Sequence, residues 1–164
     1  MQKIQRGEIE QRVQALRERL LTAVDLVDDD LLQQPETIGE HSIGQILGFL
    51  GLWSEATNKG LREVQRRKKP TDLLRWHEDN RRFFADAVSE TAHEDRAELL
   101  ERLEDGLFQF EARMEQLSYD DLNRPKRIRF LGNKPLWPLI ASLTYEHDEP
   151  FVEQIERFVA RANN

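Results

Sequence analysis

The sequence contains no cysteine, which excludes disulfide bonds, thiolate metal ligands and a cysteine nucleophile. It also lacks long apolar runs, since no stretch approaches the roughly 18 residues of a membrane span. The first residues are polar and show no apolar core of a signal peptide, so we expect a cytoplasmic protein without a membrane partner. Positive charge is in deficit, and the net charge is −7. This balance disfavours nucleic acid as a partner, because such binding rests on neutralising phosphates.

One basic run, RRKKP at positions 66–70, departs from this balance. It lies at the end of an expected helix, where cations offset the negative end of the helix dipole. We interpret it as a solvated helix end in preference to a phosphate-binding patch.

Apolar residues recur at steps of three and four along most of the chain, the pattern of amphipathic helices. The spacing predicts helices over about residues 6–32, 42–69, 97–117 and 135–162, with a shorter one over 72–90. No segment sustains the alternation of a β-strand. We therefore expect an all-α, up-and-down four-helix bundle, with one extra short helix between the two helix pairs, as a single domain over residues 1–164.

Local signals support some of these boundaries. Ser42 followed by Gln45 predicts a capping box, and Thr71 is expected to cap the short helix. A faint repeat also appears: DDDLLQQP before Gly39 is echoed by YDDLNRP before Gly132. The bundle is therefore interpreted as two similar helical hairpins.

His147 falls at the centre of the apolar stripe of the last predicted helix. The neighbours Tyr145, Asp148 and Glu149 are predicted to face solvent, and Pro150 is expected to kink the helix beside a pocket. A buried imidazole without a partner costs on the order of 1–3 kcal/mol, so some donor, acceptor, water or ligand should meet it. A hydrogen-bonded core histidine is the commoner outcome, and a catalytic general base is the alternative.

Two long motifs, SIGQILGFLGLWSE at 42–55 and TYEHDEPFVEQIERF at 144–158, resemble helices of DinB/YfiT-like proteins. The turns VDLVDDDLLQQP and MEQLSYDDLNRP resemble those that precede these helices, so the likeness spans nearly the whole chain. The resemblance implies an up-and-down four-helix bundle, often a homodimer. Many members carry a divalent metal on three histidines. Some are transferases or isomerases that use the thiols bacillithiol, mycothiol or glutathione.

The metal ligands implied by this resemblance fall on Phe49 in the second long helix and on His147 and Phe151 in the last. Zinc or nickel needs about three protein ligands, and phenylalanine cannot coordinate. We therefore expect no metal cofactor. A rebuilt site is also disfavoured; its candidate ligands are Glu55, His77, Asn80 and Glu146. The pair Pro150-Phe151 resembles the ClbS/DfsB-like branch, which departs from the three-histidine pattern and includes a protein that hydrolyses the cyclopropane of a genotoxic product.

Three hypotheses remain open. In the first, the protein is metal-free and binds or transforms a small molecule, with His147 as the polar or catalytic group and an apolar wall made of Phe49, Trp53, Trp76 and Phe151. In the second, these rings fill the former metal cavity, and the inactive bundle acts as a homodimeric interaction module. The third is a metal-dependent thiol S-transferase with replaced ligands. An open cavity at His147 would favour the first over the second.

The segment WHEDNRRFF, at 76–84, combines aromatic and polar side chains. We expect Trp76, Phe83 and Phe84 to pack against the bundle while His77 and Asn80 face water. The remaining histidines, His41 and His93, are expected to be exposed.

Overall fold

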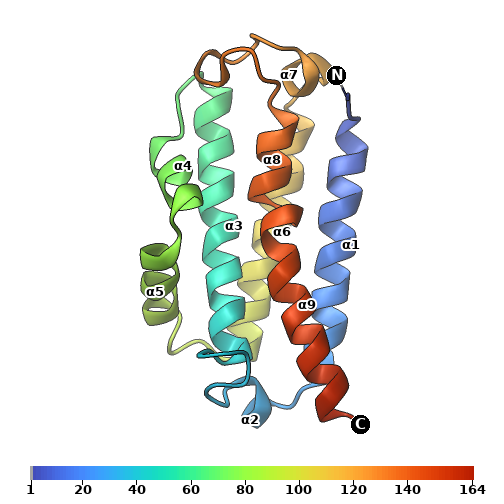
Figure 1. Cartoon of the computed structure of the whole chain (residues 1–164), viewed down its shortest axis with the longest axis vertical. Coiled ribbons are helices and arrows are strands. Elements are labelled where there is room, and N and C mark those ends of the chain that lie inside the picture. Colours follow the sequence, from blue (N-terminus) through green and yellow to red (C-terminus); the bar gives the residue numbers. More distant parts are fainter. Residues whose placement is uncertain (1) are drawn as a thin grey trace.

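The computed structural model describes residues 2–164, and helices account for most of them (Figure 1). In chain order the elements are α1 (Arg6–Asp25), α2 (Asp29–Leu32), α3 (Ile43–Gln65), α4 (Thr71–Glu78), α5 (Arg81–Glu90), α6 (Arg96–Glu115), α7 (Tyr119–Asn123), the 3-10 helix η1 (Arg129–Leu131), α8 (Trp137–Leu143) and α9 (Tyr145–Ala162). Over these residues no strand forms, apart from an isolated bridge between Ile38 and His41. The predicted all-α class is confirmed.

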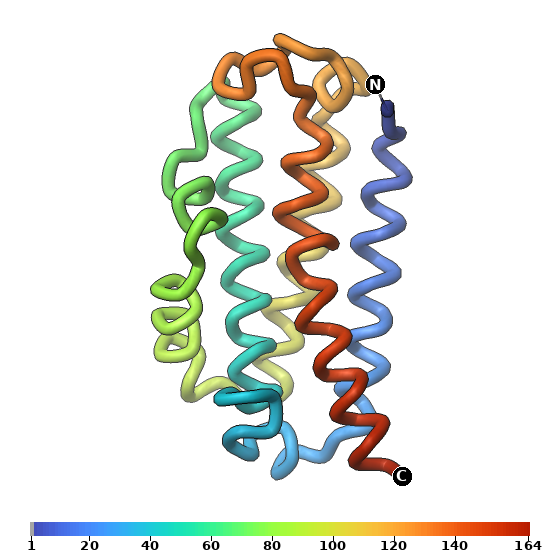
Figure 2. The backbone as a smooth tube through the Cα atoms, in the orientation of Figure 1, coloured from blue at the N-terminus to red at the C-terminus, as the bar shows by residue number. Residues whose placement is uncertain are grey.

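Four long segments run along the long axis of the molecule: α1, α3, α6, and α8 followed by α9 (Figures 1 and 2). Helix α3 packs against α6, and α1 packs against α9. The interior is filled by the apolar stripes of these helices, including Leu20, Leu47, Leu50 and Leu103. Each such side chain contributes about 1.5–3 kcal/mol by leaving water. The predicted up-and-down four-helix bundle is therefore present.

Three predicted helices are split, and in two of them polar side chains compete with the helical backbone. The first helix ends at Asp25, since the Asp28 carboxylate accepts a hydrogen bond from the Leu31 amide at 2.8 Å and caps α2. The short helix divides at Asp79, whose backbone is extended and whose carboxylate pairs with Arg81 at 2.7 Å. One predicted short helix is thus two, α4 and α5, lying outside the bundle against α3.

Of the two predicted helix caps, the one at Ser42 is present and the one at Thr71 is not. Ser42 and Gln45 form the predicted capping box at the start of α3. The prediction for Thr71 is wrong, because Pro70 occupies the N-cap and Thr71 is the first helical residue, without a side-chain cap bond.

The two connections at opposite ends of the bundle share a backbone pattern, which supports the repeat. Each contains a short capped helix, α2 or α7, followed by a proline. The next residue has a positive φ, 58° at Glu36 and 64° at Lys126. Gly39 and Gly132 then adopt φ values of 61° and 60°. Over residues 2–164 no helix has the combination of length and apolar character needed to cross a membrane.

Candidate functional site

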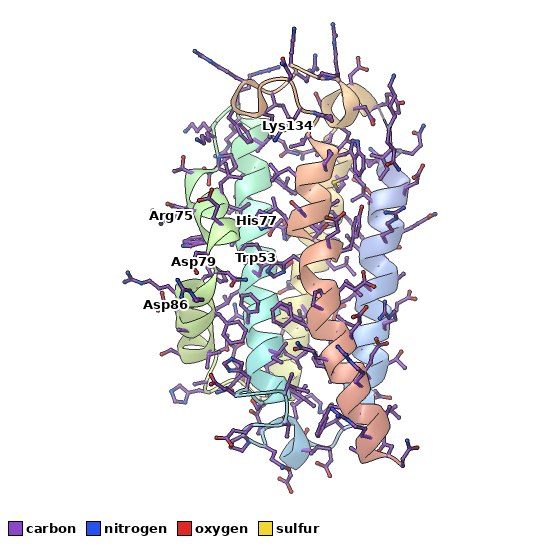
Figure 3. The ribbon with its side chains drawn as sticks, in the orientation of Figure 1. Trp53, Arg75, His77, Asp79, Asp86 and Lys134 are labelled. Atoms are coloured by element: carbon purple, nitrogen blue, oxygen red, sulfur yellow. The ribbon has the colours of Figure 1, made fainter. Side chains whose placement is uncertain are left out.

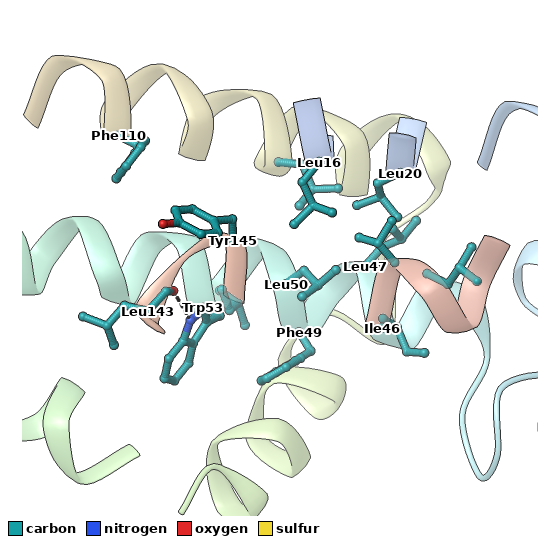
Figure 4. Packing of buried hydrophobic residues seen from close by; sticks show 14 of the residues in the cluster. Leu16, Leu20, Ile46, Leu47, Phe49, Leu50, Trp53, Phe110, Leu143 and Tyr145 are labelled. Atoms are coloured by element: carbon teal, nitrogen blue, oxygen red, sulfur yellow. Dashed lines mark hydrogen bonds between the residues drawn. The ribbon is translucent and has the colours of Figure 1, made fainter. Parts of the chain in front are cut away.

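The last long helix is interrupted at Thr144, in the middle of the bundle. The backbone there has φ −117° and ψ −103°, and the Thr144 hydroxyl donates to the Ile140 carbonyl at 2.7 Å. The indole N–H of Trp53 donates to the Leu143 carbonyl at 2.9 Å (Figure 4). A side chain inserted into the helical ladder in this way is a known cause of a break.

The predicted single helix with a kink at Pro150 is therefore wrong. The break lies six residues earlier, and Pro150 sits inside the continuous helix α9, in its second turn. Of the two prolines expected at the start of the last helix, Pro138 lies in the first turn of α8, and Pro135 precedes it.

His147 lies just after the break, with its side chain only 7% exposed. Its ring stacks on Trp53, with centroids 4.3 Å apart and planes 9° from parallel. Its Nδ1 is 2.7 Å from Oδ1 of Asp148, whereas its Nε2 is buried and has no hydrogen-bond partner within residues 2–164. The predicted solvent orientation of Asp148 is wrong, because that side chain is only 16% exposed; Tyr145 is buried as well. Both errors arise from treating the broken helix as continuous.

The hydrogen bond to Asp148 selects one tautomer of the neutral imidazole. A carboxylate only accepts, so in that neutral form Nδ1 carries the proton and Nε2 presents a lone pair. An imidazole held in this way can accept a hydrogen bond, take up a proton as a general base or bind a metal ion.

Arg17 is a second buried ionisable side chain, and it lines the same small cavity as Asp148. Arg17 of α1 donates to the Leu103 carbonyl at 2.8 Å. Burial lowers the pKa of its guanidinium, and the carboxylate of Asp148 opposes that shift. Both side chains line a cavity of about 20 Å³, together with Thr57 and Asn58, whose side-chain oxygens have no partner in the described chain. That space is sufficient for one water molecule.

The three positions implied by the family resemblance meet at one place. The ring centroids of Phe49 and His147 lie 5.6 Å apart, those of Phe49 and Phe151 lie 5.3 Å apart, and those of His147 and Phe151 lie 5.8 Å apart. Phe49 has no exposed surface, and Trp53 is 1% exposed. Two of the predicted wall residues are therefore fully enclosed and in aromatic contact with His147.

Helix α5 covers this place from outside. Its Phe84 ring lies 4.4 Å from Phe49, and its Phe83 ring meets Trp53 edge-on at 5.4 Å. We call the set the ring cluster; it comprises Phe49, Trp53, Phe83, Phe84, His147 and Phe151. Trp76, also predicted as a wall, contacts Phe83 at 5.0 Å and so lies in an outer layer.

Two other histidines adjoin the ring cluster, contrary to the prediction that they face water. The ring of His77 lies 6.3 Å from that of Trp53, and both are labelled in Figure 3. Burial lowers the pKa of His77, and the nearby imidazole of His147 adds to that shift. The ring of His41 contacts Phe84 at 4.4 Å.

The residues present do not fit the three-histidine metal site. Phe49 and Phe151 offer no donor atom, and within residues 2–164 no group of three or more histidine, cysteine, aspartate or glutamate side chains is arranged to hold a metal ion. Of the substitutes considered, Glu55 pairs with Arg102 at 2.6 Å and Glu146 is exposed.

Comparisons with known proteins agree with this architecture. The family model described as the DinB superfamily matches residues 12–147. The fold is similar to the crystal structure of a Streptococcus pneumoniae protein from a structural genomics consortium, with a TM-score of 0.79 and 14% identity over 96% of this chain and 92% of that chain. At that identity the likeness shows the fold alone. No curated protein matches the chain.

Proposed function

The chain belongs to the DinB superfamily, and from that premise we propose that its ring cluster is a metal-free binding site for a small, largely apolar molecule that carries one hydrogen-bond donor. The observation that carries the proposal is Nε2 of His147, a buried acceptor without a partner in the described chain. Leaving such an atom unpaired costs about 1–3 kcal/mol. A ligand that donates to Nε2 recovers that free energy, whereas an isosteric ligand without a donor does not.

The side chains around Nε2 of His147 indicate the shape and polarity of the rest of the ligand. Small-molecule sites are typically lined by apolar and aromatic side chains around a few well-placed polar groups. Here the face of His147 is stacked on Trp53, and the rings of Phe49 and Phe151 flank it. A planar, apolar or aromatic ligand suits these surfaces, because aromatic faces and edges attract one another.

The rings around His147 already touch, which by the criterion of an open cavity favours the filled core, so ligand entry requires movement of the outer layer. The rings of Phe49, Phe83 and Phe84 are in contact, so a ligand must displace α5 or its side chains. Helices α4 and α5 pack on α3, outside the pairs α3–α6 and α1–α9 that hold the bundle together. Their displacement therefore leaves the main core contacts in place.

The same geometry suits general-base chemistry. Asp148 holds the imidazole through Nδ1, so a ligand hydroxyl or amine bound at Nε2 is placed to transfer its proton there. His147 is thus the proposed catalytic residue if the ligand is transformed, and Asp148 positions it.

The test compares phenol with toluene, two probes of nearly equal size that differ in one donor. We expect phenol to bind the wild-type protein at least about fivefold more tightly, the equivalent of about 1 kcal/mol for one net hydrogen bond. Calorimetry gives the affinities, and the ¹⁵N shift of His147 Nε2 reports the contact. His147→Phe is the matched control, in which the preference for phenol should vanish. Equal affinities, or no binding of either probe to a folded wild type, would refute the proposal.

A second candidate is an inactive interaction bundle that acts as a homodimer, and one observation favours it. Phe49 is wholly buried among rings that already touch, as expected if phenylalanines fill the space of a lost metal site. This candidate predicts no preference for phenol and a dimer in sedimentation velocity at micromolar concentration. A thiol S-transferase mechanism has no support from the donor atoms present at the ring cluster.

A further inference from the structure

Two basic segments far apart in the sequence meet at one end of the bundle. The first follows the last turn of α3, and the second follows α7; Lys134, labelled in Figure 3, lies at the same end. Between them is a pocket of about 610 Å³. Its cationic lining consists of Arg67, Lys68, Lys69, Arg127 and Arg129, which we call the basic pocket.

Most of this charge is uncompensated. Arg127 pairs with Asp121 at 3.1 Å. The other four cations of the basic pocket form no ion pair within residues 2–164, although the chain as a whole carries a net charge of −7. The dipole of α3 favours cations at its own end, which accounts for Lys68 and Lys69. It does not account for Arg129, which the other segment brings to the same pocket.

The backbone at Arg67 is left-handed, as it is at Glu36 and Lys126 in the two connecting turns. Its φ is 60°, and the amides of Arg67 and Lys68 donate to the carbonyls of Val64 and Glu63 at 2.9 and 2.8 Å. This is the Schellman ending of a helix, in which the left-handed position usually belongs to glycine. An arginine there costs free energy that a glycine would not.

The floor of the pocket is apolar. Val64 is buried, and Ile128 and Phe130, which also line the pocket, are half-buried. The volume lies within the range of about 300–1,000 Å³ that small-molecule sites show. A ligand that suits both parts therefore combines an apolar portion with a compact, multiply charged anion.

We propose that the basic pocket binds the phosphate groups of a small phosphorylated molecule that also carries an apolar portion. Arginine presents paired donors that match phosphate oxygens, and lysine adds a point charge. Four uncompensated cations suit an anion with two or more charges, such as a pyrophosphate or a phosphomonoester. The same chemistry is offered by a free metabolite or by a phosphorylated lipid headgroup. This site is separate from the ring cluster and does not depend on its function.

The test uses inorganic pyrophosphate in calorimetry at low salt, and sedimentation with vesicles containing 10% phosphatidylinositol phosphate in phosphatidylcholine. We expect Lys69→Gln/Arg129→Gln to weaken binding at least about tenfold, with further weakening in all variants at higher salt. Arg157→Gln/Arg161→Gln is the matched control, because it removes the same charge from α9 near the C-terminus. Binding of pyrophosphate without the vesicles assigns a free ligand, binding only of the vesicles assigns a lipid headgroup, and binding of both supports the phosphate site itself.

Arg67→Gly separates binding from a structural role. It removes the guanidinium and relieves the left-handed strain, so we expect a higher melting temperature together with weaker binding. A higher melting temperature with unchanged binding would remove Arg67 from the proposal. Absence of binding by both probes, or an equal loss in the control pair, would overturn the proposal as a whole.

Discussion

Replacing both Phe49 and Phe151 by histidine tests whether side chains at these two positions and His147 can coordinate one metal ion. A Zn–N bond is about 2.1 Å long, and the ring centre lies roughly 1.1 Å beyond the nitrogen, so each imidazole centre is about 3.2 Å from the ion. Two such centres at the tetrahedral angle are about 5.2 Å apart. The observed separations are 5.3, 5.6 and 5.8 Å. The three positions are therefore spaced, within about 0.6 Å, as three imidazoles around one ion.

We expect the double variant to bind one zinc ion and the wild type to bind none. The unloaded variant should melt below the wild type, because it buries imidazoles where apolar rings now pack. Zinc at 100 times its dissociation constant should add about 2.7 kcal/mol of stability. For a chain of this size that corresponds to about 5–11 °C in melting temperature. Differential scanning fluorimetry with and without zinc measures the shift, and calorimetry gives the stoichiometry.

Two further variants complete this experiment. His147→Ala in the double-variant background should abolish the shift, because two imidazoles then remain. Asp148→Asn in that background should weaken zinc binding about 10- to 100-fold, the usual effect of losing the partner of a ligating imidazole. A folded double variant whose melting temperature does not respond to zinc would show that the three side chains do not converge.

Three other predictions concern stability. Trp53→Phe should cost about 1–3 kcal/mol in urea unfolding, because the Leu143 carbonyl loses its donor, whereas Trp137→Phe, whose indole bond is long and exposed, should cost less. Phe49→Ala should cost about 3–5 kcal/mol in the same assay, since a wholly buried ring is removed; a loss under 1 kcal/mol would contradict the packing described. Burial lowers the pKa of His77 in the folded state, so the unfolded chain takes up its proton first as the pH falls below about 6.5. Stability should therefore decline from pH 7 toward the lower folded pKa, and His77→Gln should decline less; an identical pH profile would contradict this reasoning.

The bundle was predictable because its main signal is local. Apolar side chains at helical spacing identify α1, α3 and α6 without knowledge of their partners. The errors at helix ends are also local in origin, since Asp28 and Asp79 prefer their own backbone bonds to the helical ladder. Whether the side-chain bond or the helical bond forms depends on small free-energy differences, and the spacing of apolar residues carries no information about them.

The site was predictable only in part. Phe49, Trp53 and Phe151 were placed beside His147 by helical phase and family resemblance, and the structure brings their rings together. Asp148 was missed because residues adjacent on a regular helix face about 100° apart. The break that brings Asp148 inward depends on a hydrogen bond spanning 90 residues, which no local pattern contains.

Arg17 was missed for a different reason. It lies beside Leu16 in an amphipathic helix, where a charged residue ordinarily marks the solvent face. Its burial reflects the Leu103 carbonyl and the Asp148 carboxylate, both supplied by other helices. No spacing rule within α1 distinguishes this arginine from the exposed Arg12 and Arg19.

The interruption at Thr144 makes the fourth long segment of the bundle two rods joined at a hinge. The brace across that hinge is the indole of Trp53, a side chain of another rod, α3. The same indole stacks on His147, so the orientation of the imidazole is set partly by α3. The two rods also need not open together, because local opening can differ between neighbouring elements. Amide hydrogen exchange on either side of Thr144 would register that difference as two separate levels of protection.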